Sequence, residues 1–426
     1  MTRVVIAIVL SLLTLSAHAE LMIQVTQGRT DAVPIAIVPF AGAADAPQNV
    51  STIIRDDLHR SGQFKALSPD DMLSRPTSED QLSYRDFRVL NQEYVVIGQE
   101  KKNADGTYQV SYGLYDVARQ RKLLSATYQP AAEQLRDVAH AISDQIYQQL
   151  TGIRGAFATK ILYVTFNHGA KQPYQLQYAD ADGARVQTIL RSSQPIMSPS
   201  WAPNGKRIAY VSFENHGWPA IYVHDLSTGK RKVVMSVKNS INGAPSFSPD
   251  GKSLALTLSR DGNPEIYTLD LATGDLTRRT NNYAIDTEAR WMPDGQHLVF
   301  TSNRSGGPQI YELNISDGSV RRLSFHGKYN ARPSVTPDGR YLVYVHRQNG
   351  RFHIAVQDLE RGTFNIVTST GMDESPSVAP NGSMVIYGTQ SGGTGVLEAV
   401  SIDGRVKVEL PSKEGAVREP AWSPFL

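Results

Sequence analysis

Short runs of alternating apolar and polar residues fill the chain from residue 160 onward. Examples are residues 207–212, 253–257, 297–301 and 341–345. A two-residue period over runs of this length, rich in β-branched and aromatic side chains, predicts β-strands. We therefore expect residues 160–426 to form an all-β region.

The pattern before residue 153 is mixed. Residues 131–150 place Leu135, Val138, Ile142, Ile146 and Leu150 at helical spacing. Residues 49–61 read as a second helix capped by Asn49 or Ser51. Strands are expected at 34–40, 94–98, 108–115 and 123–129. We predict a small α/β domain over residues 20–152, joined to the β region by a linker at 153–159.

A repeated phrase organises the β region. The sequence Pro-Ser-Trp-Ala-Pro-Asn-Gly at 199–205 recurs in related form, and its second proline falls at positions 203, 249, 293, 337, 380 and 424. A period in the low forties with several short strands per repeat is typical of β-propeller blades. Each Pro-Asp/Asn-Gly sequence favours a tight turn, because proline presets φ and glycine accepts a left-handed conformation. The repeats therefore predict four-stranded blades with a hairpin after each innermost strand.

The two ends of the β region are incomplete in complementary ways. The last repeat supplies an innermost strand at 420–425 without a second strand, and residues 160–166 read as a second strand without an innermost one. Joining them makes one split blade, which with five continuous blades gives six. Such closure also removes two exposed sheet edges. An open solenoid is the alternative. We predict a six-bladed β-propeller whose ring is closed by the C-terminal strand.

The first nineteen residues have the order of a secretory signal peptide. Arg3 precedes an apolar run at 4–15, and Ala17-His18-Ala19 matches an A-x-A cleavage site. Cleavage after Ala19 would leave a mature protein beginning at Glu20. No later run is long and apolar enough to span a bilayer, so we expect an exported protein that is not embedded in the membrane.

Composition excludes several kinds of chemistry. There are 43 Lys and Arg against 41 Asp and Glu, so the charge gives no reason to expect nucleic-acid binding. The absence of cysteine excludes disulfides, thiolate metal ligands and a cysteine nucleophile. No G-x-S-x-G, H-E-x-x-H, phosphate-loop or dinucleotide motif occurs. The sequence 180–183 begins like a calcium loop but lacks the closing glutamate, which favours a hairpin turn. We predict no catalytic residue, no metal site and no cofactor.

After these exclusions, the remaining candidate for a functional site is a surface at one mouth of the predicted channel. The residues just before each repeated phrase should converge there, because innermost strands line a propeller's channel. They are polar and mixed in charge: Met197, Ser198, Asn242, Gly243, Ala244, Thr287, Glu288, Asn330, Ala331, Arg332, Asp373, Glu374, Arg418 and Glu419. This set is either a solvated rim of loops or a place to hold a peptide or loop.

A signal peptide, a small α/β domain and a six-bladed ring ending in Pro-Ala-Trp-Ser-Pro-Phe-Leu together resemble the TolB family of the periplasmic Tol–Pal system. The most specific stretches are 242–251, 373–382, 384–387 and the closing segment. The resemblance implies a non-enzymatic periplasmic adaptor that binds the lipoprotein Pal at the channel mouth and binds TolA through its mature N-terminal segment. It further implies a role in outer-membrane integrity and in envelope constriction at cell division, and a mouth that some colicin-like peptides exploit.

Carried onto this sequence, the resemblance implies two sets of contact residues. Those for Pal are Asn242, Ala244, Thr287, Glu288, Arg332, Glu374 and Arg418. Those for TolA are Glu20, Leu21, Met22, Ile23, Gln24 and Val25, within a segment that extends to about residue 30. The competing hypotheses are a propeller-based periplasmic hydrolase or lyase and a module that binds peptidoglycan directly.

Overall fold

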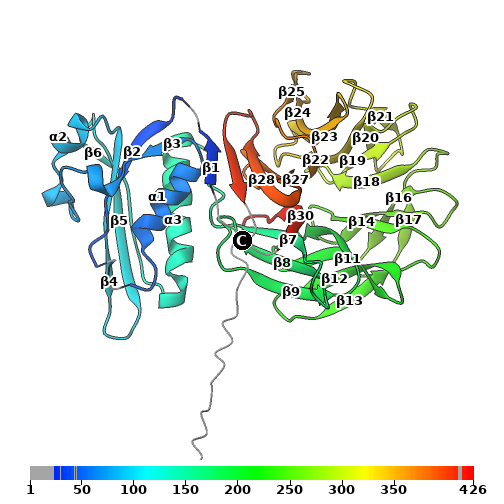
Figure 1. Ribbon diagram of the computed structural model, residues 1–426, viewed down its shortest axis with the longest axis horizontal. Coiled ribbons are helices and arrows are strands. Elements are labelled where there is room, and N and C mark those ends of the chain that lie inside the picture. The colour runs from blue at the N-terminus through cyan, green and yellow to red at the C-terminus, as the bar shows by residue number, and fades with distance from the viewer. Residues whose placement is uncertain (1–23, 29, 43, 45, 411–414) are drawn as a thin grey trace, which may run out of the picture.

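The computed structural model describes residues 24–28, 30–42, 44, 46–410 and 415–426 (Figure 1). The predicted signal peptide, its cleavage site at Ala19 and the predicted contact residues Glu20 to Ile23 lie outside these residues. Within them, an α/β domain stands beside a β-propeller, as expected (Figure 1). No helix of the described residues has both the length and the apolar character needed to cross a membrane.

The N-terminal domain is built on one mixed sheet in the order β3-β2-β4-β5-β6. Its strands are β2 (Val33–Ile37), β3 (Phe64–Ala66), β4 (Tyr94–Lys102), β5 (Tyr108–Asp116) and β6 (Arg121–Tyr128). Its helices are α1 (Val50–Arg60), α2 (Tyr84–Val89) and α3 (Leu135–Thr151), with 3₁₀ turns η2 (Pro69–Asp71), η3 (Glu79–Gln81) and η4 (Ala132–Gln134). Helices α1 and α3 cover the sheet face nearer the propeller, and α2 lies on the other side (Figure 1).

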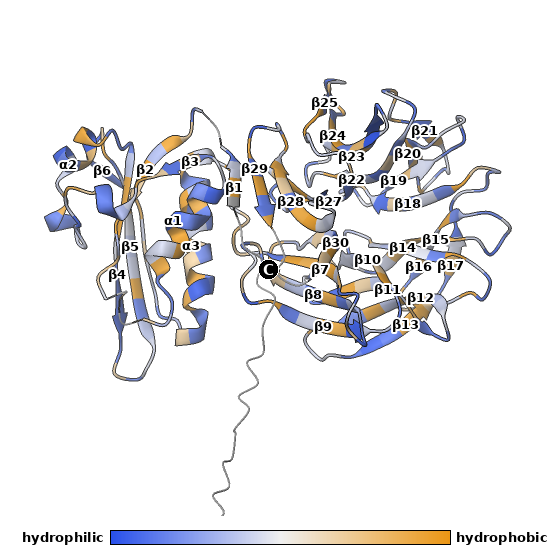
Figure 2. Ribbon diagram, in the orientation of Figure 1, coloured by the Kyte–Doolittle hydropathy of each residue, from blue (hydrophilic) through white to orange (hydrophobic). Residues whose placement is uncertain are grey.

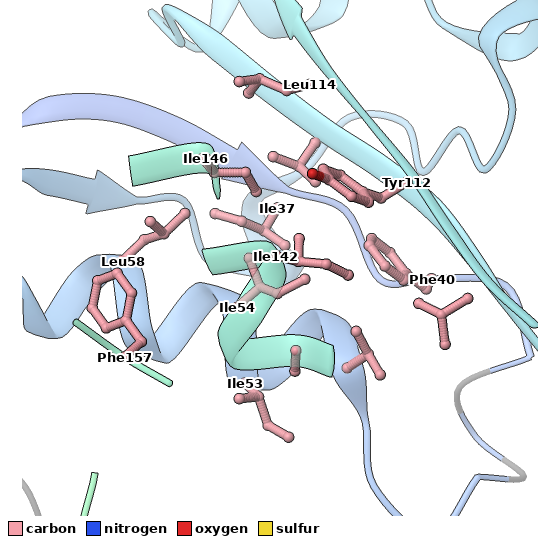
Figure 3. Packing of buried hydrophobic residues seen from close by; sticks show 14 of the residues in the cluster. Ile37, Phe40, Ile53, Ile54, Leu58, Tyr112, Leu114, Ile142, Ile146 and Phe157 are labelled. Carbon is pink, nitrogen blue, oxygen red and sulfur yellow. The ribbon is translucent and has the colours of Figure 1, made fainter. Parts of the chain in front are cut away.

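Local chemistry explains where the two long helices begin and end. The Asn49 side chain accepts the Thr52 amide at 3.0 Å, which is the predicted N-cap of α1. Helix α3 stops at Gly152, whose φ of 78° is left-handed, and the Gly152 amide bonds to the Gln148 carbonyl. Ile54, Ile142 and Ile146 then interlock with Ile37 of the sheet (Figure 3), so the predicted helical spacing becomes the core of this domain.

Six antiparallel sheets form the propeller in the described part of the chain. In Figure 2, apolar residues recur along its strands. From the innermost strand outward, blade 1 comprises β30 (Ala416–Trp422), β7 (Lys160–Phe166), β8 (Tyr174–Asp180) and β9 (Gln187–Ser192), and blade 2 comprises β10 (Ile196–Trp201), β11 (Arg207–Asn215), β12 (Trp218–Asp225) and β13 (Arg231–Met235). In the same order, blade 3 comprises β14 (Asn242–Phe247), β15 (Ser253–Leu258), β16 (Glu265–Asp270) and β17 (Leu276–Arg278), and blade 4 comprises β18 (Asp286–Trp291), β19 (His297–Ser302), β20 (Gln309–Asn314) and β21 (Val320–Arg322). Blade 5 comprises β22 (Asn330–Val335), β23 (Tyr341–Gln348), β24 (Arg351–Asp358) and β25 (Phe364–Ile366), and blade 6 comprises β26 (Glu374–Val378), β27 (Met384–Ser391), β28 (Thr394–Ser401) and β29 (Lys407–Leu410).

The repeated phrase forms the turn that its composition predicts. In the first copy, the Gly205 amide bonds to the Ala202 carbonyl at 3.0 Å, and Gly205 has a φ of 65°. The positive φ favours glycine, and a β-carbon at this position would also displace the end of the Leu426 side chain, 2.3 Å away. In blades 2 to 6 these turns therefore hold the innermost strand against the second strand.

The ring is closed by the C-terminal strand, as predicted. Strand β30 pairs antiparallel with β7 from Ala416 opposite Phe166 to Trp422 opposite Ile161. The paired strand begins four residues before the predicted 420–425. Beyond it, the Ser423 hydroxyl accepts the Lys160 amide and the Ser423 amide donates to the Lys160 carbonyl. Blade 1 is therefore assembled from chain segments about 260 residues apart.

A second terminal segment adds to blade 6. Strand β1 (Gln24–Gln27) pairs with β29 and becomes the fifth, outermost strand of that sheet (Figure 1). The order of the sheet is therefore β1-β29-β28-β27-β26, running from the outer edge to the channel.

Ionic side chains join the two domains at the turn predicted for residues 180–183. Arg136 of α3 contacts both Asp180 and Asp182, while Lys160 donates to Asp180 at 2.8 Å. Burial raises the pKa of Asp180, but hydrogen bonds from Arg185 and Lys160 outweigh it and hold that pKa below its usual value. The segment is a turn, as expected, and its carboxylates bind cationic side chains of both domains.

Candidate functional site

The six innermost strands surround a channel through the propeller. Each contacts its neighbours on both sides, with β30 between β26 and β10. The channel encloses a cavity of about 500 Å³. Because the strands are repeats of one unit, equivalent residues lie at the same level around the channel. The walls can therefore be described as successive layers of six side chains.

Every innermost strand carries a bulge at the same place. The register with the second strand shifts there in all six blades. The residue at the bulge has a left-handed backbone although it is not glycine. These six residues, which we name the rim ring, are Ser198 (φ 49°), Ala244 (48°), Glu288 (59°), Arg332 (55°), Ser375 (53°) and Glu419 (52°).

A left-handed backbone at a non-glycine residue costs roughly 1 kcal/mol or more, and such residues persist where the surrounding structure imposes them. Bulges also redirect a side chain relative to a regular strand. All six rim-ring residues line the channel cavity. The bulges therefore turn six side chains toward one space at a repeated cost in stability, which is typical of a functional surface.

Charged members of the rim ring are paired across blades. The Arg332 guanidinium lies 3.2 Å from the Glu288 carboxylate and also donates to the Ser375 hydroxyl. Burial alone would lower the pKa of Arg332, but Glu288 and the other nearby carboxylates raise it. Blades 4, 5 and 6 are thus connected by one hydrogen-bonded chain at this level.

Glu419 of blade 1 is the buried acid of the ring. It is 8% exposed, and its carboxylate accepts the Ser198 amide of blade 2. Burial raises the pKa of Glu419, and the bond from Ser198 and the charge of Arg332 only partly counteract this. Strand β30 therefore contributes a residue to the channel mouth. It also forms the seam of the ring, by which we mean its pairing with β7.

The seven residues predicted for Pal binding lie at three kinds of position: in the rim ring, directly before it in the chain and, for Asn242, two residues before it. Ala244, Glu288 and Arg332 belong to the rim ring. Thr287, Glu374 and Arg418 each precede a rim-ring residue and are half-buried. The Arg418 guanidinium lies over the Phe166 ring at 5.5 Å. Ala244, Glu288 and Arg332 therefore line the channel cavity, whereas the other three lie next to rim-ring residues in the chain and are not part of the cavity lining.

Asn242 occupies a different environment. It is 1% exposed, and its side chain accepts the Val237 amide and donates to the Val237 and Ser240 carbonyls. Its amide group is thus used in holding the loop that leads into β14. Asn242 shapes the mouth from behind, because its polar atoms are already bonded within the protein.

Three members of the rim ring are missing from the predicted contact residues. Ser198 and Glu419 belong to the set that the sequence places at the mouth, whereas Ser375 lies outside it. A signal is present in the repeat itself, since each rim-ring residue directly precedes the first residue of the phrase. The bulge that distinguishes this position arises from strand pairing and is not visible in residue type.

Of the six residues predicted to contact TolA, the structure describes Gln24 and Val25, both in β1. Gln24 pairs with Glu409 and Val25 with Val408. Val25 is half-buried against the core shared by blades 6 and 1, whereas Thr26 and Gln27 are exposed. The described end of this segment is therefore an edge strand with one apolar anchor.

A further group of ligand-type side chains lies at the domain junction. Asp57, His140 and Asp182 lie within reach of one another. His140 Nδ1 is 2.7 Å from Asp57, and Arg60 and Arg136 pair with Asp57 and Asp182. Burial raises the pKa of Asp57, but His140 and Arg60 hold it below its usual value. The carboxylates are thus neutralised by side chains of the protein itself.

Comparison with known proteins gives a consistent result over the whole chain. The TolB beta propeller domain matches residues 147–426, and the TolB amino-terminal domain matches residues 21–123. The Tol-Pal system protein TolB of Alcanivorax borkumensis is 70% identical over 424 residues, covering all of this chain and 98% of the relative. That of Pseudomonas fluorescens strain SBW25 is 44% identical over 430 residues, covering 100% and 99%.

A solved structure agrees with these relatives. TolB from Acinetobacter baumannii superposes with a TM-score of 0.89 and 46% identity, covering 95% of this chain and all of that one. Both relatives are named as Tol-Pal system proteins, in agreement with the family that the sequence resembles. The matches to both domains and the near-complete coverage show that this chain belongs to the TolB family of Tol-Pal system proteins.

Proposed function

We propose that this protein is a periplasmic adaptor that binds Pal at the mouth of its propeller and TolA through its mature N-terminal segment. In this role it supports outer-membrane integrity and envelope constriction at cell division. The observation that carries the proposal is the rim ring, in which six strained residues direct side chains into one mouth. Membership of the TolB family supports the same choice of partners.

The Pal surface consists of the rim ring and the residues before it. Glu288 and Arg332 present opposite charges that are already paired, so a partner meets a preorganised polar surface rather than one isolated charge. Thr287 lies in this surface beside Thr257, with 3.3 Å between the two hydroxyl oxygens. Asn242 contributes by fixing the loop behind Ala244.

Thr287→Arg tests this surface. The larger, charged side chain should block the mouth and weaken Pal binding at least tenfold in calorimetric titration, while the melting temperature stays within about 2 °C of the wild type. Thr277→Arg is the matched control, because Thr277 is exposed on the outer strand β17 of the adjacent blade. A parallel loss of Pal affinity and of thermal stability would mean that the rim is structural.

A capture experiment separates the adaptor from the competing hypotheses. Immobilised wild-type protein should retain Pal from an envelope extract, and Thr287→Arg should not. Retention of a glycan polymer in place of Pal would favour the peptidoglycan-binding hypothesis and contradict the adaptor proposal. Sustained turnover of peptide or glycan substrates would contradict it as well.

The TolA surface is the segment that begins at Glu20 and runs into β1. Strand β1 holds three paired residues with an irregular register, so it can leave β29 and pair elsewhere at little cost. An extended segment of this kind suits recognition by strand addition. Removing residues 20–30 should abolish TolA binding in a pull-down, while a chain with Thr26→Ala, which retains the strand, should still bind.

Blade 6 offers a physical connection between the two surfaces. One sheet carries β1 at its outer edge and Glu374 and Ser375 at the mouth. If Pal prefers one position of β1, occupation of the mouth shifts the balance between docked and free β1, and the coupling is reciprocal. Removal of residues 20–30 should then change Pal affinity. Unchanged Pal affinity after this deletion would rule the coupling out, whatever its effect on TolA binding.

A further inference from the structure

A second layer of six residues lines the channel two positions beyond the rim ring. We name it the inner ring, and its members are Ser200, Ser246, Arg290, Ser334, Ser377 and Ala421. Five blades place serine or alanine at this level, and blade 4 alone places a long cationic side chain there. The same blade also replaces the proline that precedes the inner-ring residue in the other five with Ala289. Arg290 thus departs from the repeat at a level of the channel where the other five side chains are small.

The backbone of Arg290 pairs with Val299 of β19, but its side chain has no hydrogen bond or ion pair with any residue that the structure describes. The two nearest rim-ring acids are already engaged. Glu288 is bound by Arg332 and by the Thr301 hydroxyl at 2.9 Å, and Glu419 accepts the Ser198 amide. An arginine stays protonated in proteins. A positive charge therefore lies inside the channel without a counter-charge of its own.

The surroundings disfavour leaving that charge unpaired. Burial and the positive charge of Arg332 lower the pKa of Arg290, whereas the negative charges of Glu288 and Glu419 oppose this without forming an ion pair with it. Arg290 is half-buried in the channel wall, so it loses part of its hydration, and proteins ordinarily pair a charge that is withdrawn from water. The lack of a protein partner among the described residues indicates that the partner comes from outside the chain.

The inner ring supplies further hydrogen-bond donors to the cavity that Arg290 lines. The Ser200 hydroxyl is buried without a partner in the described residues, and Ser200 is only 6% exposed. Ser246 and Ser334 carry hydroxyls at the same level. At this level the inner ring itself contains no carboxylate, since its other members are serine and alanine. Donors of this kind match the oxygens of an anion.

We propose that Arg290 and the inner-ring serines form an anion-binding site inside the channel, one layer below the mouth, that takes a carboxylate or a similar small oxyanion. The planar guanidinium can hold both oxygens of a carboxylate through two parallel N–H···O bonds. The cavity of about 500 Å³ is larger than a single small anion. The anion can therefore come from solution or from an acidic side chain of a protein at the mouth, and the second source rests on the proposed function.

Arg290→Ser is the test, because it gives blade 4 the residue that four other blades carry at this level. Arg321→Ser is the matched control. It removes the same charge from an exposed side chain on β21 of the same blade, 71% exposed and paired with Glu312. Both variants should fold, since neither changes a turn, a bulge or an apolar core residue.

Sodium acetate is the probe for a free anion. In a low-salt buffer, with sodium chloride as the ionic-strength control, acetate should raise the melting temperature of the wild type and of Arg321→Ser in a saturable manner. The Arg290→Ser variant should show at least a tenfold weaker apparent affinity for acetate. In nuclear magnetic resonance spectra, the Nε–Hε signal absent from Arg290→Ser should be the one that acetate shifts in the wild type.

Pal is the probe for a carboxylate supplied by a partner. If that source applies, Arg290→Ser should weaken Pal binding at least tenfold and Arg321→Ser should not, even where acetate alone has no effect. The inference is overturned if acetate fails to distinguish the wild type from Arg290→Ser and Pal binds both equally. That result leaves the proposed function standing when Thr287→Arg still abolishes Pal binding. Conversely, absence of Pal binding by the wild type would refute the proposed function, while the acetate experiment would still decide the anion site.

Discussion

The described N-terminal segment and the C-terminal segment each add one strand to the propeller, at opposite edges of neighbouring blades. Strand β1 is the outer edge of blade 6, whereas β30 is the channel-side strand of blade 1. The first has three paired residues and exposed Thr26 and Gln27. The second has five paired residues and continues into buried Ser423. A strand at the outer edge of a blade can leave the sheet and pair elsewhere, whereas a strand at the channel is enclosed by the other blades.

The neighbours of the two strands account for the difference. Strand β1 contacts β29, with one side-chain bond from Thr26 to the Lys407 carbonyl at 3.3 Å. Strand β30 contacts the innermost strands of two other blades as well as β7, β27 and β28. A segment that is held by few contacts opens locally more often than a segment that is held by many. We therefore expect β1 to exchange its amide hydrogens much faster than β30.

Deleting residues 420–426 should have the largest effect. It removes Ala421 and Trp422 from the pairing with β7 and leaves the edge of β7 open at Ile161 and Leu162. We expect the melting temperature to fall by roughly 10 °C or more, or cooperative unfolding to be lost, as measured by calorimetry. A truncated protein that melts at the wild-type temperature would refute the closure.

Trp422→Ala should weaken the seam without opening it. The Trp422 ring packs against the core shared by blades 6 and 1, and its Nε1 donates to the Thr159 hydroxyl at 2.9 Å. Since the ring is only partly buried, the loss should be about 3 kcal/mol in denaturant unfolding. Trp422→Phe retains an aromatic ring and should lose about 1 kcal/mol from the missing bond. Equal losses in the two variants would show that packing does not hold the seam.

A pH experiment examines the segment that leads into the seam. The Asp144 carboxylate accepts the Phe157 and Ala158 amides just before β7, and burial raises its pKa to about 6. Between about pH 4 and 6 the folded state holds this proton more tightly than the unfolded chain. The contribution of Asp144 to stability is therefore full below about pH 4 and declines as the pH rises through 6.

Asp144→Asn should remove that dependence. The difference in unfolding free energy between the wild type and the variant should shift by at most about 2 kcal/mol between pH 4 and 7, with the wild type relatively more stable at the acid end. Parallel stability curves for the two proteins over this range would show that Asp144 does not titrate there.

Removing β1 should have the smallest effect on stability. A chain that begins at Gly28 loses the half-buried Val25 side chain and three residue pairs. We expect a loss of about 1 kcal/mol or less, seen as a small shift in the melting temperature. A fall as large as that caused by deleting residues 420–426 would contradict the distinction between the two strands.

Local turn chemistry makes most of the architecture predictable. Pro203 and Gly205 and their equivalents define a hairpin wherever they occur, so the spacing of the phrase is enough to count six blades and to identify the split one. Helices α1 and α3 follow from spacing and from the Asn49 cap. Strand β3, with three residues, and helix α2, with six, are too short to give a periodic signal.

The mouth is only partly predictable, because its special features arise from tertiary structure. The left-handed backbone at Ser375 results from a bulge against β27, and nothing in the residue type announces it. Asn242 has the residue type of a polar contact, but its side chain bonds within the loop that precedes it. The junction between Arg136 and Asp182 joins residues whose proximity no local pattern reveals.

The position of β30 also sets an order of events during folding. Strands β7, β8 and β9 are synthesised early, yet the strand that completes their blade comes about 260 residues later. A nascent chain therefore carries an unfinished blade until β30 has been synthesised, and the ring can close only after that. Contacts so distant in sequence slow folding and leave an unpaired edge exposed meanwhile. Any factor that protects β7 during this interval would govern the yield of the folded protein more than its final stability does.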